Sequence, residues 1–304
     1  MMAEARQEAM PGTFGNWMKS VQAEMEAALA SFLPLDTMTP AALHGAMRYA
    51  ALDGGKRVRP LLVFAAGALF DANREILTRA AAAVEMIHAY SLVHDDMPCM
   101  DDDALRRGKP TVHVKYDEAA ALLVGDALQA QAFLVLAEGR GDAARKVEMI
   151  SLLARASGSL GMCGGQAIDL ASVGVTLSLA ELEQMHALKT GALLRASVLL
   201  GAMSGKALSA PEVSALDDYA KAIGLAFQVV DDVLDATADS VTLGKTAGKD
   251  AADNKPTYVS ILGLEESRNL AEKLRNDAHR ALIPFGGQAQ RLRELADLIV
   301  QRKA

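Results

Sequence analysis

The stretch AIGLAFQVVDDVLDA, residues 222–236, decides the fold class. Its apolar residues recur three and four positions apart, which is the spacing of one face of an α-helix. The same spacing returns along nearly the whole chain, and no segment alternates convincingly with the period of two that a half-buried strand needs. The sequence therefore predicts an all-α protein.

Helix start signals agree with this periodicity. Ser178 with Glu181, and Ser209 with Glu212, fit the capping-box pattern, and Pro211 suits an early helical position. The expected helices cover residues 14–32, 40–51, 60–70, 73–96, 118–138, 142–163, 178–204, 211–236, 257–282 and 287–302.

The domain organisation follows from the segments between these helices. At 304 residues, one large domain or two are both compatible with the length. The loops are charged and too short to act as flexible linkers, and no repeat of fixed period is visible. We therefore expect a single domain over residues 1–304, a helical bundle around a central apolar cavity, with residues 1–12 loosely ordered.

Composition excludes several classes of partner and compartment. With 38 acidic against 31 basic residues, binding to nucleic acid or to an anionic membrane surface is not expected. Two cysteines without a spaced framework favour a reducing compartment, by default the cytoplasm. Residues 1–10 lack an apolar core and residues 61–70 are too short to cross a bilayer, so we expect neither a targeting peptide nor stable membrane insertion.

Two clusters of aspartates occupy unfavourable places. The first crowds the C-terminal end of the expected helix 73–96, where the helix dipole disfavours negative charge, and consists of Asp95, Asp96, Asp101, Asp102 and Asp103. The second lies inside the apolar stretch 222–236, where Asp231 and Asp235 repel each other one turn apart with Asp232 between them. One acidic run is usually a solvated surface, but the negative charge of two such runs at apolar helices must be compensated. A Mg²⁺ ion can compensate this charge, because it binds carboxylates together with substrate phosphate.

Basic residues gather in three other segments. GGKRVRP contains Lys56, Arg57 and Arg59, LRRGKP contains Arg106, Arg107 and Lys109, and LGKTAGKDAADNKP contains Lys245, Lys249 and Lys255. Each patch alone could be ordinary surface charge. Alternating with the aspartate clusters, they indicate binding of a diphosphate bridged by metal ions.

At this point the sequence resembles a known family, the bacterial farnesyl diphosphate synthases among the trans-isoprenyl diphosphate synthases. The similarity is carried in order by residues 54–60, 85–113, 124–129, 164–170, 189–194 and 227–235, followed by LGKTAGKD and NKPTY. It implies an all-α isoprenoid-synthase fold, a homodimer, and condensation of dimethylallyl or geranyl diphosphate with isopentenyl diphosphate to farnesyl diphosphate. Geranyl or geranylgeranyl diphosphate as the product stays an alternative.

The resemblance also implies roles for individual residues. The expected ligands of Mg²⁺, with three ions and Mn²⁺ as an alternative, are Asp95, Asp96, Asp101, Asp231, Asp232 and Asp235. The expected catalytic residues are Lys189, a ligand of the allylic diphosphate, and Thr190 and Gln228, which line the reacting centre. The further expected ligands of the allylic diphosphate are Arg106, Lys245 and Lys255, and the expected ligands of isopentenyl diphosphate are Lys56, Arg59, His88 and Arg107, with Gly55 also in the substrate-binding set. Tyr90 and Ser91 are expected to set the chain length of the product.

Three other functions share part of this pattern. A class I terpene cyclase uses similar metal chemistry, but it usually guides carbocations with aromatic faces, and aromatics are only 4% here. A ferritin-like di-iron bundle would use Glu85 with His88 and Glu183 with His186, yet it leaves both aspartate clusters unexplained. A non-catalytic partner subunit of a larger prenyltransferase would typically lack the aspartates.

Overall fold

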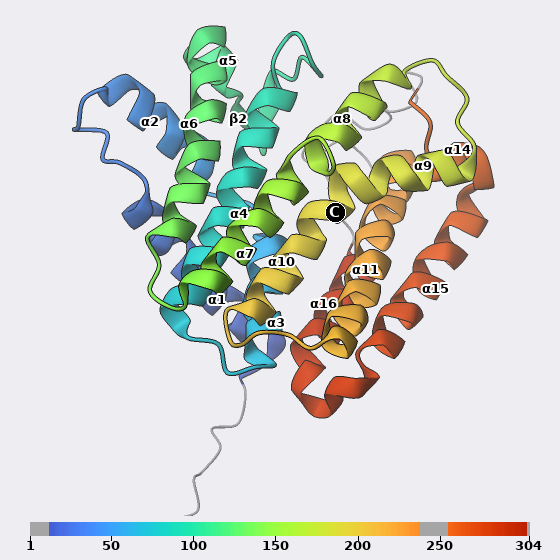
Figure 1. Cartoon of the computed structure of the whole chain (residues 1–304). Coiled ribbons are helices and arrows are strands. Elements are labelled where there is room, and N and C mark those ends of the chain that lie inside the picture. Colours follow the sequence, from blue (N-terminus) through green and yellow to red (C-terminus); the bar gives the residue numbers. More distant parts are fainter. Residues whose placement is uncertain (1–11, 238–254, 303–304) are drawn as a thin grey trace, which may run out of the picture.

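The structure is a computed structural model that describes residues 12–237 and 255–302, and it is built almost entirely of helices (Figure 1). The first half contains α1 (Phe14–Phe32), α2 (Ala41–Ala51), α3 (Val58–Ala68), α4 (Arg74–Asp95), α5 (Val112–Lys115), α6 (Glu118–Ala137) and α7 (Ala143–Ser157). The second half contains α8 (Met162–Ala171), α9 (Leu179–His186), the π-helix η1 (Ala187–Gly191), α10 (Ala192–Met203), α11 (Ala210–Thr237), α14 (Tyr258–Leu262), α15 (Leu264–Ala281), the 3-10 segment η2 (Ile283–Ala289) and α16 (Gln290–Gln301). The expectation of an all-α fold is confirmed.

The helices pack around α4, α10 and α11. Helix α4 contacts α6 and α3, α10 contacts α3, α7 and α11, and α11 contacts α15 and α16, so that the layers run from α6 on one side to α15 on the other (Figure 1). The four consecutive alanines Ala80–Ala83 of α4 are fully buried. Their small side chains let the neighbouring helices approach closely, which places the end of α4 among several other elements.

The expected helix 142–163 is wrong at its C-terminal end. Helix α7 ends at Ser157, and Gly158 follows with extended backbone. Gly161 lies so close to the preceding turn that a Cβ there would come 2.3 Å from the Ala156 carbonyl oxygen. The chain therefore turns sharply at these glycines and restarts as α8, a helix that the periodicity did not separate.

One further expected helix is divided, and another changes its helix type in the middle. Gly263, with a φ of +82°, divides residues 257–282 into α14 and α15, because this left-handed backbone suits glycine but not helix continuation. The expected helix 178–204 is continuous, but its middle turn is the π-helix η1. The capping box of Ser178 and Glu181 is confirmed at the start of α9.

One short hairpin was not predicted. Strand β1 (Leu105–Arg106) pairs antiparallel with β2 (Lys109–Pro110). Its two turn residues, Arg107 and Gly108, have φ values of +53° and +74°, as the tight turns that join such strands require. The hairpin sets the direction of two arginines that matter below.

Helices α4 and α6 are long and apolar enough to cross a bilayer by length and composition alone. In α4 this apolarity belongs to the protein core, since two thirds of its most apolar window, 67%, is buried. In α6 the buried share is 39%. The exposed residues of α6 include Leu122, Leu123 and Leu134.

Candidate active site

The first aspartate cluster is folded back on itself by a tight turn after α4. The backbone N–H of Asp101 donates to the Asp95 carbonyl at 2.9 Å, and that of Asp103 donates to the Asp96 carbonyl at 3.1 Å. Burial raises the pKa of Asp95 to about 6, although the Lys189 ammonium opposes the shift and Asp101 reinforces it. Negative charge is thus concentrated at this helix end at an energetic cost.

Arg106 on β1 neutralises one member of this cluster. Its Nε donates to both carboxylate oxygens of Asp96, at 2.7 and 2.9 Å, and Asp96 is 3% exposed. Lys255 reaches the same cluster and donates to Asp101 at 3.0 Å. Two of the expected allylic-diphosphate ligands therefore lie beside the aspartates, while a third, Lys245, is outside the described residues.

The second cluster lies on α11 and is held from three directions. Asp232 is 3% exposed and accepts hydrogen bonds from Gln228 Nε2 at 3.0 Å and from the Tyr258 backbone N–H at 2.8 Å. Asp231 accepts one from Arg302 at 2.7 Å. Asp235 is 7% exposed, and its Oδ1 has no hydrogen-bond partner among the described residues.

This orphaned carboxylate oxygen fits a cation. A buried carboxylate without a donor is costly, and a hard divalent ion compensates it. Within the described ranges no three acidic, imidazole or thiol groups lie together so that they could hold a metal ion by themselves. Water and phosphate oxygens would have to complete the shell of a bound ion, as they usually do for Mg²⁺.

The π-helix η1 carries Lys189 and Thr190. Lys189 Nζ donates to Asp169 Oδ2 at 2.6 Å, and Thr190 Oγ1 donates to Gln228 Oε1 at 3.4 Å. Gln228 in turn donates to Asp232, so that a hydrogen-bonded chain joins η1 to the second cluster. Gly165 permits this packing, since a Cβ there would lie 2.1 Å from the Lys189 backbone nitrogen.

A cavity of about 360 Å³ opens in front of η1 and α4. Its charged and polar lining includes Asp95, Lys189, Thr190, Arg59 and His88. The rest of its lining is mostly apolar and includes Tyr90, Ser91, Met162, Ala167 and Leu170. One cavity therefore combines charged groups with an apolar wall.

A second cavity, of about 560 Å³, adjoins the first. The lining residues include Gly55, Lys56, Arg107 and Phe227, and Arg59 and His88 belong to both cavities. Burial and the Arg107 charge lower the pKa of Arg59 to about 10, against the opposing effect of Glu85. Burial and the surrounding arginines also hold the pKa of His88 well below its usual range, so its imidazole is neutral. This cavity has the charge for a second anion.

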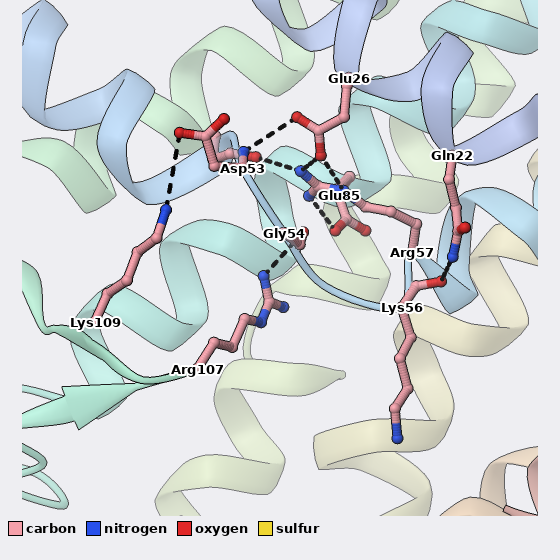
Figure 2. A network of polar contacts seen from close by, with 10 residues as sticks. Gln22, Glu26, Asp53, Gly54, Lys56, Arg57, Glu85, Arg107 and Lys109 are labelled. Carbon is pink, nitrogen blue, oxygen red and sulfur yellow. Dashed lines mark hydrogen bonds and ion pairs between the residues drawn. The ribbon is translucent and has the colours of Figure 1, made fainter. Parts of the chain in front are cut away.

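Arg57 differs from the other cations of its segment. Figure 2 shows that its guanidinium turns toward Glu26 and Glu85, while the side chain of Lys56 extends the opposite way. Arg57 therefore differs from the other cations of its segment in being paired with these two carboxylates, although it also borders the cavity. The di-iron alternative finds no support, because Glu85 is paired with Arg57 and no three acidic, imidazole or thiol groups of the described residues lie together as a metal site.

Sequence reasoning assigned no role to several site residues. Asp169, which holds Lys189, stands in the matching segment 164–170 and could have been found there. Arg302 lies 71 positions from its partner Asp231, and nothing in the local sequence announces the contact. The same holds for Glu26, which lies 31 positions from Arg57.

Comparisons with known proteins agree with this geometry. The sequence model described as polyprenyl synthetase matches residues 40–282. The farnesyl diphosphate synthase of Escherichia coli is 51% identical over 262 residues, which cover 84% of this chain and 88% of the relative. A structure of an FPP/GFPP synthase from Zymomonas mobilis superposes with a TM-score of 0.86 at 44% identity, over 96% of this chain and 100% of that one. A geranyltransferase from Helicobacter pylori, solved with magnesium and isoprenyl diphosphate, gives a TM-score of 0.82 at 32% identity, over 96% of this chain and 98% of that one.

Proposed function

The chain belongs to the polyprenyl synthetase family, and on this premise we propose that it is a farnesyl diphosphate synthase. It condenses dimethylallyl diphosphate, and then geranyl diphosphate, with isopentenyl diphosphate. The observation that carries the proposal is the pair of adjoining cavities that share Arg59 and His88. One cavity combines Asp95 and Lys189 with an apolar wall, as an allylic diphosphate and its metal ions need. The other cavity is lined by basic residues and suits a second diphosphate.

Magnesium fits the two aspartate clusters. The residues that would hold it are Asp95 at the end of α4, Asp101 in the turn that follows, and Asp231 and Asp235 on α11, with Asp96 and Asp232 as supporting members of the clusters. Among the described residues, Asp235 Oδ1 has no hydrogen-bond partner. When bound, Mg²⁺ neutralises the diphosphate charge that grows as the allylic carbon–oxygen bond breaks. Three ions, with Mn²⁺ as a substitute, remain the expected set.

Cations positioned in advance stabilise the same developing charge. Lys189 is held by Asp169 and Arg106 by Asp96, so these donors need little rearrangement when the diphosphate arrives. Lys255 and, outside the described residues, Lys245 complete the proposed allylic-diphosphate ligands. Thr190 and Gln228 orient each other at the reacting centre.

The second substrate is held by the basic cavity. Lys56, Arg59 and Arg107 bind the diphosphate of isopentenyl diphosphate, and neutral His88 contributes a hydrogen bond. Gly55 is required there because a Cβ would come 2.6 Å from Arg107 Nη1, and its φ is +93°. Binding both substrates in adjoining cavities brings the double bond to the allylic carbon.

The apolar interior protects the allylic cation from water until the new carbon–carbon bond forms. The proton that is lost afterwards goes to the released diphosphate, which is the nearest basic group in this scheme. Tyr90 borders the interior and favours farnesyl over geranylgeranyl diphosphate as the product.

A second copy of the chain is the proposed partner. The exposed leucines Leu122, Leu123 and Leu134 on α6, together with Val147 on α7, offer an apolar surface for a homodimer. Covering this surface would also explain how so apolar a helix belongs to a soluble, cytoplasmic protein.

Incubation with dimethylallyl and isopentenyl diphosphates tests the proposal. We expect farnesol as the main product after dephosphorylation, and no product when EDTA replaces Mg²⁺. A cyclic hydrocarbon made from farnesyl diphosphate, or no turnover with Mg²⁺, would contradict it.

A further inference from the structure

Arg57 lies in the segment that presents cations to the basic cavity and borders that cavity, yet its guanidinium is bound by other groups of the protein. Arg57 is 4% exposed. Its Nη1 donates to Glu85 Oε1 at 2.7 Å, its Nη2 donates to the Ala51 carbonyl at 2.8 Å, and its Nε donates to Glu26 Oε1 at 3.1 Å. These contacts connect the start of α3 to α1, α2 and α4 at once.

Glu26 also holds the other end of the same loop. Its Oε2 accepts a hydrogen bond from the Asp53 backbone N–H at 3.1 Å, while Oε1 binds Arg57 (Figure 2). One turn earlier on α1, Gln22 Nε2 donates to the Lys56 carbonyl at 3.1 Å. Helix α1 therefore fixes the loop 53–57 at three points.

The backbone of Arg57 needs such support. Its φ of +52° and ψ of +38° are left-handed, a conformation that is unfavourable for a residue with a side chain. This conformation turns the chain between Lys56 and Arg59, so the direction of both cations depends on it. The buried contacts of the guanidinium offset its cost.

We infer that Arg57 and Glu26 form a positioning pair that fixes the loop 53–59 so that Lys56 and Arg59 can receive the diphosphate of isopentenyl diphosphate. Neither member touches the substrate. The inference rests on the proposed function for the identity of that substrate, but the anchoring itself is a property of the loop and can be tested with inorganic pyrophosphate.

The direction in which Glu26→Gln changes anion binding distinguishes a positioning role from a purely electrostatic one. Glu26→Gln removes a negative charge near an anion-binding cavity, and by Coulomb's law alone this change strengthens anion binding. Loss of the anchor has the opposite effect. Glu26 Oε1 accepts from Arg57 and Oε2 accepts from the Asp53 N–H, and in glutamine an NH2 donor replaces one of these two acceptors and faces another donor. Weaker binding after removal of a negative charge therefore points to the lost geometry.

The experiment compares Glu26→Gln with Glu24→Gln. Glu24 lies on the same helix, is paired with Arg74, and receives the same chemical change two positions away, on another face. Calorimetric titration with inorganic pyrophosphate in EDTA measures the basic cavity without metal. We expect the Kd of Glu26→Gln to rise about tenfold and that of Glu24→Gln to stay near the unsubstituted value.

Steady-state kinetics supply the second readout. For Glu26→Gln we expect the KM of isopentenyl diphosphate to rise about tenfold, with the KM of the allylic substrate unchanged. Arg57→Lys should show the same division, since an ammonium cannot replace the forked contacts of the guanidinium. If that buried substitution prevents folding, Glu26→Gln, which is partly exposed, still decides the question.

The inference is overturned if Glu26→Gln binds pyrophosphate as tightly as the unsubstituted protein or more tightly, or if both substrates lose affinity equally. A protein that forms no prenyl product would contradict the proposed function alone. The pyrophosphate comparison between the two glutamine variants would then decide the positioning role by itself.

Discussion

Arg302 Nη2 donates to Asp231 Oδ1 at 2.7 Å, which brings the end of α16 onto the second aspartate cluster. The same nitrogen donates to the Phe227 carbonyl at 2.7 Å, and the guanidinium lies 3.9 Å from the centre of the Phe227 ring. A residue near the end of the chain thus neutralises a proposed metal ligand in the absence of metal.

Arg302→Met should lower the Mg²⁺ concentration needed for half-maximal rate. The arginine and the cation share one carboxylate, so removing the arginine removes a competitor. For a partly exposed ion pair, worth up to about 1 kcal/mol, we expect a decrease of about two- to fivefold. The measurement is initial rate against Mg²⁺ concentration.

Arg293→Met is the matched control. Arg293 lies on α16, which Arg302 directly follows, and in the described part of the chain its side chain donates to the backbone carbonyls of Gly286 and Leu282. Its magnesium requirement should not change. An unchanged or higher requirement in Arg302→Met would show that the arginine does not compete with the metal.

The pH dependence of the metal-free protein should report Asp95. Its folded-state pKa is raised to about 6, so the folded state binds this proton more tightly than the unfolded state. The stability that comes from the protonated form is present below the ordinary pKa of 3.8 and is lost as the pH rises through about 6. Asp95→Asn should therefore stabilise the protein at about pH 7.5 by on the order of 1 kcal/mol, and less at about pH 4.5.

Urea unfolding in EDTA at the two pH values measures this difference, and the variant should also lose most turnover. Asp102→Asn, an exposed aspartate in the same turn, should show no such pH-dependent gain. A stabilisation of Asp95→Asn that is equal at both pH values would contradict the assignment.

Arg106 and Arg107 are adjacent in sequence but should affect different substrates. Arg106 ends strand β1 and points to Asp96, whereas Arg107 occupies the turn and donates to the Gly54 carbonyl at 3.2 Å. Arg107→Gln should raise the KM of isopentenyl diphosphate, and Arg106→Gln that of the allylic substrate. Each change should be about ten- to hundredfold, as for hydrogen bonds to charged groups. The measurement is the KM of each substrate for both variants. An equal rise of both KM values in each variant would contradict the separate assignment.

Much of the fold could be predicted because helical periodicity is a local signal. The expected span 14–32 coincides with α1, and the box of Ser178 and Glu181 begins α9 where expected. The errors in the predicted helix boundaries come from backbone conformation and not from the hydrophobic pattern. Gly158 and Gly161 divide one expected helix, and the hairpin depends on the left-handed backbone of Arg107, which no hydrophobic pattern encodes.

For the site, sequence could predict the reactive groups but not what holds them. The aspartate clusters and most of the cations were visible as motifs. Of these, the structure places Asp95, Lys56, Arg59, Lys189 and Arg107 in the lining of the two adjoining cavities, and the second cluster is linked to Thr190 in that lining through Gln228. Their supports come from distant positions: Glu26 for Arg57, and Arg302 for Asp231. Such contacts depend on how helices cross, so the spacing of residues within one helix carries no information about them.

The last prediction concerns product length and Tyr90. Its side chain is 8% exposed and lies edge-on to the His94 ring, with 5.8 Å between the two ring centroids. Tyr90 and Ser91 both line the cavity. Tyr90 lies five residues before Asp95 on α4, about 7.5 Å along the helix axis at 1.5 Å per residue. A tail that grows inward from a diphosphate at Asp95 therefore meets the Tyr90 ring after a limited number of isoprene units.

Tyr90→Ala should open the interior and shift the product from farnesyl to geranylgeranyl diphosphate or longer, with the first condensation changed less than about threefold, because Tyr90 does not contact the diphosphate in this scheme. Tyr90→Phe is the control: it removes the hydroxyl but keeps the ring, so farnesyl diphosphate should remain the main product. Chromatography of the dephosphorylated products distinguishes the lengths. If Tyr90→Ala gives the same farnesol peak as the unsubstituted protein, the ring does not limit growth, and the limit must come from the facing residues of α8, such as Met162, which line the same cavity.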